Sequence, residues 1–324
     1  MKKIIIVHTG GTISMLENKE TGEVNTTNDH PLANITYNFG EDVVIDEHIE
    51  FSLPSPHITP NHMLQLAKTV EKLLTEYEGV VITHGTDTLE ETAYLLDLVL
   101  DTEKPVILTG AMRSSNEIGS DALYNLISSI RVVLSPAAYS KGVLVVMNDE
   151  IHSAVNVTKT STSNVATFQS PQYGPIGIIT KETIIFHHQL ISRTTYPVEN
   201  ITKNVPLLKA YAGMDSTIID LIANGNPDGL IIEGLGQGNL PKQTIPAIKR
   251  ILAKDIPIIL VSRSFRGNVQ PTYSYEGGGK KLKELGVIFT NGLTGPKARI
   301  KLLIALENTS DLQVIRDIFE NDIY

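Results

Sequence analysis

Two short apolar runs of this chain each end in a turn rich in threonine and glycine. Residues 3–7 lead into His8-Thr9-Gly10-Gly11-Thr12-Ile13, and residues 80–82 lead into Thr83-His84-Gly85-Thr86-Asp87-Thr88. An apolar run that stops at Gly and hydroxyl residues is typical of a parallel strand whose carboxyl end opens a turn. In open α/β sheets, ligands bind at that edge, where the strand order reverses. The two turns therefore predict one crevice that holds two threonine hydroxyls and a carboxylate.

The composition is that of an ordinary globular protein and excludes several classes of function. The 324 residues are 41% apolar and 19% charged, and they carry a formal net charge of −9. This charge disfavours nucleic acid as a partner, because phosphate binding needs a basic surface. No apolar run reaches the ~20 residues that span a bilayer, and the apolar run after Lys3 stops at His8, too short for a secretory signal. The chain lacks cysteine, so a cytoplasmic location is expected and thiolate chemistry is excluded.

Strand-like and helix-like segments alternate along the first two thirds of the chain. This rhythm predicts an α/β fold with a mostly parallel sheet flanked by helices. The expected helices are 59–77, where Thr59 can cap, 90–100 and 121–134, and the expected strands are 80–82, 105–108 and 142–147. Residues 174–179 and 183–186 are predicted to form a hairpin, and the polar stretch 14–30 a mobile loop.

The segment 192–204 has no clear period and contains a proline, so we interpret it as a linker. It separates a larger N-terminal catalytic domain, 1–191, from a smaller C-terminal α/β domain, 205–324. In the second domain the expected strands are 205–211, 229–232 and 256–261, and the expected helices are 216–223, 245–253, 297–306 and 312–319.

Three motifs suggest other kinds of site and fit poorly. Residues 234–239 resemble the start of a dinucleotide fingerprint, but Asn239 stands where the third glycine belongs and Pro241 follows. Residues 277–280 have the wrong spacing for a phosphate-binding loop and favour a flexible turn. The pair His187-His188 lacks a matching third ligand, so a solvated pair is expected in place of a zinc site.

Each threonine turn alone is usually a helix cap or an ordinary turn. Here two such turns share the same strand-end position, and Thr86 and Asp87 are adjacent. Lys159 lies in a hydroxyl-rich stretch, 157–162, where a lysine is most often a surface charge. A lysine can also share hydroxyl protons and so activate a nucleophile without histidine. Ser55 lies between two prolines, in a turn that would hold its hydroxyl rigidly.

Taken together, these segments resemble the bacterial-type L-asparaginase family. The resemblance rests on Thr9-Gly10-Gly11-Thr12-Ile13, His84-Gly85-Thr86-Asp87-Thr88 and Val157-Thr158-Lys159-Thr160, with support from residues 108–113, 172–175 and 295–299. It extends from residue 4 to near residue 320. The resemblance implies hydrolysis of L-asparagine to L-aspartate and ammonia, without metal or organic cofactor, by a homotetramer built from two close dimers.

The resemblance also implies roles for individual residues. Thr12 is expected to be the nucleophile, while Thr86 and Lys159 handle protons and the attacking water. Asp87 is expected to bind the substrate's α-amino group, and Ser55 its α-carboxylate. Whether Lys159 acts as a proton acceptor or as a fixed positive charge stays open.

Further positions are expected to line the substrate. The glycines at 10, 11 and 85 allow the backbone to approach a ligand closely, and Ala111 belongs to a matching segment. The family completes each site from a neighbouring subunit, and the matching positions are Asn239 and Glu276.

One departure from the family and two alternative functions remain. The family places a tyrosine on the loop after the first threonine, but residues 13–34 contain none and the nearest is Tyr37.

The alternatives are the asparaginase-like, ammonia-producing subunit of a tRNA-dependent amidotransferase and a non-catalytic amino-acid-binding regulator. The amidotransferase subunits carry an extra N-terminal domain, whereas the first strand here is expected near residue 3. A regulator would have no need of a nucleophile.

Overall fold

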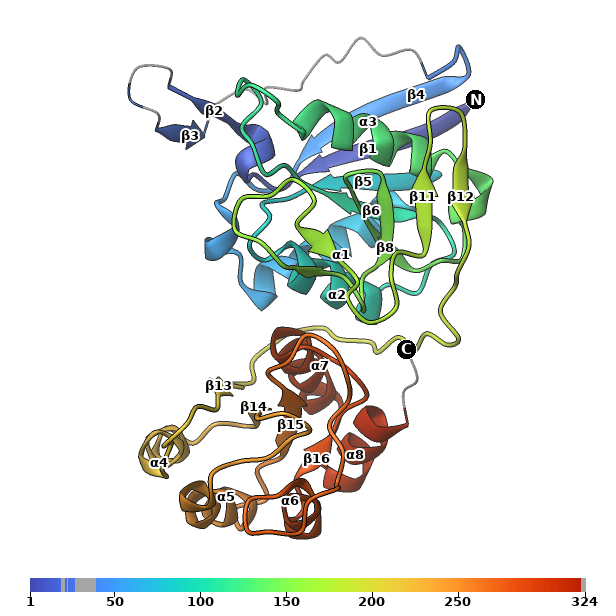
Figure 1. Ribbon diagram of the computed structural model, residues 1–324. Helices are drawn as coiled ribbons and strands as arrows, with labels where there is room; N and C mark the ends of the chain where they lie inside the picture. Colours follow the sequence, from blue (N-terminus) through green and yellow to red (C-terminus); the bar gives the residue numbers. More distant parts are fainter. Residues whose placement is uncertain (19–20, 22, 27–38, 322–324) are drawn as a thin grey trace. The chain divides into compact units, whose positions relative to one another are not determined.

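The chain folds into two compact units, Met1–Thr195 and Tyr196–Tyr324. A computed structural model describes residues 1–18, 21, 23–26 and 39–321. Each unit has its own sheet (Figure 1), and each has its own apolar core. The domain boundaries expected from the sequence, with a linker at 192–204, stay a prediction.

The first unit is built on an eight-stranded sheet, and its mostly parallel α/β architecture confirms the predicted fold class. The strand order is β12-β11-β8-β7-β6-β5-β1-β4, in which β4, β1, β5, β6 and β7 are parallel to one another, whereas β8, β11 and β12 each pair antiparallel with their neighbours. The strands are β1 (Lys2–His8), β4 (Val43–Ile49), β5 (Gly79–Thr83), β6 (Val106–Thr109), β7 (Val143–Met147), β8 (Glu150–Ser153), β11 (Gly177–Ile179) and β12 (Ile184–Phe186).

Helices cover both faces of this sheet (Figure 1). They are α1 (Pro60–Leu73), α2 (Leu89–Val99) and α3 (Ala122–Val133). Because side chains alternate along a strand, Ile4 and Ile6 of β1 pack with Leu126 and Ile130 of α3, and the helices α1 and α2 pair on the opposite face. Thr59 caps α1 as expected, since its hydroxyl accepts from the His62 N–H.

In the main sheet the structure adds two strands, β4 and β8, to those expected from the sequence. The edge strand β4 pairs with β1 over seven residues, but its half-exposed side chains give no clean alternation. The strand β8 turns back on β7 through Asn148 and Asp149, whose φ angles of 50° and 64° suit a tight hairpin turn. The hairpin predicted around 174–186 is confirmed as the antiparallel pair β11 and β12.

Two short antiparallel pairs lie outside the main sheet. The strands β2 (Met15–Glu17) and β3 (Val24–Thr26) form one pair, and β9 (Thr158–Lys159) and β10 (Phe168–Gln169) form the other. The stretch 14–30, predicted to be a mobile loop, therefore contains two short strands that the prediction missed. The rest of that prediction falls outside the described residues, except for positions 14, 18, 21 and 23.

The second unit contains a four-stranded parallel sheet in the order β13-β14-β15-β16. Its strands are β13 (Leu207–Lys209), β14 (Leu230–Gly234), β15 (Ile258–Ser262) and β16 (Ile288–Phe289); its helices are α4 (Thr217–Asn224), α5 (Ile245–Leu252), α6 (Gly279–Leu285), α7 (Gly295–Asn308) and α8 (Leu312–Glu320). The expected flexible turn at 277–280 was wrong in part, because Gly277, Gly278 and Gly279 are buried and Gly279 begins α6.

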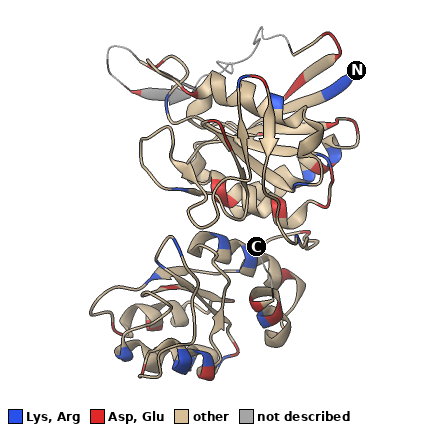
Figure 2. Ribbon diagram, turned by 45° about the vertical axis from the view of Figure 1, so that its right-hand side comes forward, with Lys and Arg blue, Asp and Glu red and all other residues tan. Residues whose placement is uncertain are grey.

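Charged residues of both signs are interspersed along the described ribbon of each unit (Figure 2). Over the described residues, every helix is too short or too polar to cross a membrane.

Candidate active site

The two threonine turns meet at the carboxyl edge of the first sheet. The strands β1 and β5 are parallel neighbours, with His8 opposite Thr83. From β1 the chain continues to β4 on one side, whereas β5 is followed by β6 on the other. This is the point where the strand order reverses, which is where open α/β sheets bind their ligands.

The turns touch through their backbones. Gly11 has a φ of 85°, and a Cβ added there would lie only 2.2 Å from the Cα of Gly85. At Gly10, with a φ of 102°, an added Cβ would likewise lie only 2.4 Å from the Leu53 carbonyl oxygen. Only glycine allows such approaches at positive φ. The glycines thus bring the segment around Leu53 and both threonine turns into direct contact.

Lys159 joins the second turn from the strand β9. Its Nζ donates to the Thr86 hydroxyl at 2.9 Å and to the Asp87 carboxylate at 2.7 Å. The Lys159 and Asp87 side chains are 18% and 59% exposed, and Thr86 is buried. The ammonium therefore lies at the boundary between protein and solvent, with one neutral and one charged acceptor.

Thr12 lies at the start of a 3₁₀ turn, Thr12–Ser14, and is half-buried. Among the residues that the structure describes, its hydroxyl has no hydrogen-bond partner. Tyr37, the nearest tyrosine after this turn, lies outside the described residues. Among the described residues the two threonines thus differ, because the Thr86 hydroxyl already accepts a hydrogen bond from Lys159.

Ser55 connects a third segment to the second turn. It is buried, its hydroxyl accepts from the Asp87 N–H at 3.2 Å, and its carbonyl accepts from the Thr88 hydroxyl at 2.8 Å. A Cβ at Gly85 would lie 2.7 Å from the Ser55 side chain. Ser55 and Asp87 therefore lie together, as two groups that bind the two charges of one amino acid would need to do.

Ala111 is buried after the next strand, β6, in a small cluster with Ile13 and Ala122. A Cβ at the preceding Gly110 would lie 2.6 Å from the His84 carbonyl. Ala111 therefore packs beside the first turn, and its segment contacts the second.

Sequence reasoning missed the role of His84. Its ring is buried, Nδ1 donates to the Gly85 carbonyl at 2.7 Å, and Nε2 accepts from the Thr92 hydroxyl at 2.9 Å. Burial lowers the pKa of His84 to about 4, so the ring is neutral near pH 7 and holds the second turn through two hydrogen bonds. The signal was a histidine followed eight residues later by a hydroxyl on the next helix.

Two polar residues before α3 hold the segment after Thr12. The Asn116 side chain accepts from the Glu17 N–H and donates to the Glu17 carbonyl, both at 2.8 Å. The Ser115 hydroxyl donates to the Ile13 carbonyl at 3.1 Å. These residues fix the path of the chain on leaving the first turn, and no local sequence signal indicated them.

In the second unit, Asn239 and Glu276 belong to adjacent segments. The Asn239 side chain accepts from the Gly279 N–H at 3.2 Å, and Leu240 N–H donates to the Gly277 carbonyl at 2.8 Å. Asn239 is half-buried and Glu276 exposed.

His187 and His188 stack edge to face, and the His187 ring contacts the Pro175 carbonyl at 3.0 Å. Within the described part of the chain, no cluster of three or more His, Asp or Glu side chains could hold a metal ion.

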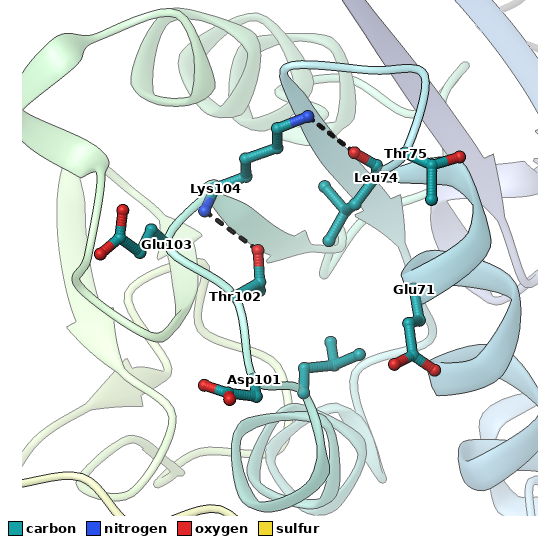
Figure 3. Close-up of a pocket in the computed structure, with 8 residues that line it drawn as sticks. Glu71, Leu74, Thr75, Asp101, Thr102, Glu103 and Lys104 are labelled. Carbon is teal, nitrogen blue, oxygen red and sulfur yellow. Dashed lines mark hydrogen bonds between the residues drawn. The ribbon is translucent and has the colours of Figure 1, made fainter.

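A cavity of about 400 Å³ lies at the opposite, amino edge of the sheet, near the ends of α1 and α2 (Figure 3). Lys104 lines this cavity, and its Nζ donates to the carbonyls of Leu74 and Tyr77 at 2.7 and 2.9 Å. Glu71 and Asp101 line the same hollow. The Lys104 Nζ therefore donates to backbone carbonyls, whereas the Lys159 Nζ donates to a side-chain hydroxyl.

Two family models match most of this chain. The family model "Asparaginase, N-terminal" matches residues 3–192, and "Glutaminase/Asparaginase C-terminal domain" matches residues 204–319. The chain belongs to the asparaginase family, which confirms the resemblance found in the sequence.

Individual relatives cover nearly the whole chain. A probable L-asparaginase of Deinococcus radiodurans is 37% identical over 100% of this chain and 99% of its own length. An L-asparaginase of Bacillus licheniformis is 34% identical, over 94% and 95%. The crystal structure of a probable cytoplasmic L-asparaginase from Campylobacter jejuni superposes with a TM-score of 0.88 at 32% identity, and covers 98% of this chain and 99% of that one.

Proposed function

We propose that this chain is an L-asparaginase that hydrolyses the side-chain amide of L-asparagine to L-aspartate and ammonia. The observation that carries the proposal is the cluster at the switch point of the first sheet. There, Lys159 contacts both Thr86 and Asp87, and the backbone contact between Gly11 and Gly85 brings the turn of Thr12 beside them. Membership of the asparaginase family supports the same activity.

In the first half of the proposed reaction, the Thr12 oxygen attacks the amide carbon of the bound asparagine. The C–N bond breaks, the hydroxyl proton of Thr12 ends on the leaving nitrogen, and ammonia departs while the acyl group stays on Thr12. Backbone N–H groups of the glycine turns are the donors available for the negative charge that develops on the carbonyl oxygen.

In the second half, water attacks the acyl carbon, its proton returns to the Thr12 oxygen, and L-aspartate is released. We assign Thr86 and Lys159 to this water and its proton, because the Lys159 ammonium already lies 2.9 Å from the Thr86 hydroxyl. We assign Asp87 to the substrate's α-amino group and Ser55 to its α-carboxylate, with Gly11, Gly85 and Ala111 lining the pocket. This division gives each charge of the amino acid a partner of opposite sign or a hydrogen-bond donor.

We further propose a cytoplasmic homotetramer, in which Asn239 and Glu276 complete the site of a neighbouring subunit. The adjacency of their two segments in the second unit supports a joint role, and the Campylobacter jejuni relative is described as cytoplasmic. Dilution of the purified enzyme to monomers should abolish activity, and full activity in a verified monomer would remove this part of the proposal.

The activity is tested by ammonia release from L-asparagine, L-glutamine and D-asparagine, with and without glutamyl-tRNA. We expect release from free L-asparagine without tRNA, and a smaller rate on L-glutamine. Release that requires tRNA and a partner would favour the amidotransferase subunit. Tight binding of asparagine with no ammonia would favour a non-catalytic regulator.

A further inference from the structure

Glu90 is a buried carboxylate that the proposed reaction leaves without a role. It is 9% exposed and lies in the first turn of α2, directly after the turn that carries Thr86 and Asp87. Its Oε2 accepts the backbone N–H of Lys159 at 2.7 Å. One side chain therefore connects the helix behind the second threonine turn to the strand that supplies the lysine.

We propose that Glu90 is a positioning residue that fixes the backbone of Lys159, so that the lysine Nζ reaches Thr86 and Asp87 together. This inference rests on the proposed asparaginase reaction. Glu90 touches neither substrate nor the reacting atoms in this scheme and acts through Lys159 alone.

The strand β9 needs such an anchor, because it is only two residues long. On one side it pairs with β10, with Lys159 opposite Phe168. Beyond that pair, the Thr160 N–H donates to the Thr167 carbonyl at 2.8 Å and closes the hairpin. These bonds hold the hairpin to itself, whereas the bond from Glu90 holds it to α2. A long, flexible lysine side chain reaches two acceptors at once only if its own backbone is fixed.

The ordinary alternative is that Glu90 only complements the dipole at the start of α2. Acidic residues in a first helical turn stabilise it by about 0.3–1 kcal/mol. Glu91 lies in the same first turn and offers the same benefit, so it serves as a matched control. The two roles also differ in what they require of residue 90: the dipole requires charge, whereas positioning requires the reach of an acceptor oxygen.

The variants Glu90→Gln and Glu90→Asp separate reach from charge. Glutamine keeps the length and an acceptor oxygen, while aspartate keeps the charge and is one methylene shorter. We expect Glu90→Gln to retain kcat within about 5-fold, and Glu90→Asp to lose about 10- to 100-fold in kcat, because a misplacement of 1 Å costs on the order of 10² in rate. KM should change by less than about 3-fold in both, since Asp87 and Ser55 stay in place.

A cycle with Lys159→Ala tests whether Glu90 acts through the lysine. In that background Glu90→Asp should have no further effect on the residual kcat. If the two residues acted independently, the losses of kcat in the two single variants would multiply in the double variant. Thermal unfolding of each variant checks that the fold is retained. The reverse order of Gln and Asp, an equal loss in Glu91→Gln, or independent effects in the cycle would each overturn the positioning role. A wild-type enzyme that releases no ammonia would instead remove the proposed function, and the inference with it.

Discussion

The two threonine turns have the same sequence pattern and the same place in the sheet, but they are built differently. Three side chains hold the second turn by hydrogen bonds: His84 donates to the Gly85 carbonyl, Ser55 accepts from the Asp87 N–H, and Lys159 donates to Thr86. The first leaves the Thr12 hydroxyl without a partner among the described residues. A hydroxyl that must bond to substrate carbon has to be accessible, whereas one that passes protons has to be connected. The contrast therefore matches the two roles proposed for Thr12 and Thr86.

The largest effect is expected from Thr12→Ala. Loss of the proposed nucleophile should lower kcat by a factor on the order of 10³ or more, equal to several kcal/mol of barrier. Steady-state ammonia release measures this, with an unchanged unfolding midpoint as the control for folding. Near-normal turnover would reverse the contrast and point to Thr86 as the nucleophile.

A substitution at Gly11 should break the contact that makes the two turns one site. In Gly11→Ala the new Cβ would lie 2.2 Å from the Gly85 Cα, at a φ of 85°. The backbone must shift, and we expect a loss of about 3 kcal/mol in the free energy of unfolding, within the range of overpacking plus an unfavourable φ. Urea unfolding measures it, and Gly40→Ala, also at positive φ but with nothing within 4 Å, controls for the φ contribution. Equal losses of unfolding free energy in the two variants would mean that the close contact between the turns does not exist.

The anchor of the second turn should make stability depend on pH. The pKa of His84 falls from 6.5 to about 4 on folding, so between these values the unfolded chain binds a proton that the folded chain does not. Stability must therefore decrease as pH falls through this window, by up to about 3 kcal/mol from this residue near pH 4. His84→Gln keeps a donor and an acceptor without titrating. The slope of unfolding free energy between pH 4 and 6.5 should be smaller in the variant, and identical slopes would contradict the burial of a neutral ring.

The smallest effect is expected at the exit of the first turn. Asn116→Ala removes two hydrogen bonds to Glu17, which should cost about 1 kcal/mol because the site is exposed, and lower kcat about 10-fold through a displaced Thr12. Asn116→Asp keeps the acceptor for the Glu17 N–H but sets an oxygen against the Glu17 carbonyl. Urea unfolding and ammonia release compare the two variants. A kcat in Asn116→Ala equal to that of wild type would show that the hydrogen bonds of Asn116 do not position Thr12.

The sequence predicted those parts of the fold and site that depend on local patterns. The apolar runs before His8 and Thr83 predicted β1 and β5, and their shared place in a parallel sheet predicted that the turns would be neighbours. The contacts of Glu90 and Asn116 could not be predicted, because each joins a side chain to the backbone of an element far away in the sequence. The edge strand β4 was missed since its exposed face breaks the alternation on which a strand prediction relies.

The most direct test of a single shared site is a crystal structure of the protein with L-aspartate, the proposed product. The account predicts the side-chain carboxyl carbon of aspartate within about 3.5 Å of both threonine hydroxyls, its ammonium on Asp87 and its α-carboxylate at Ser55. Aspartate bound in the cavity beside Lys104, or touching only one of the two turns, would contradict it.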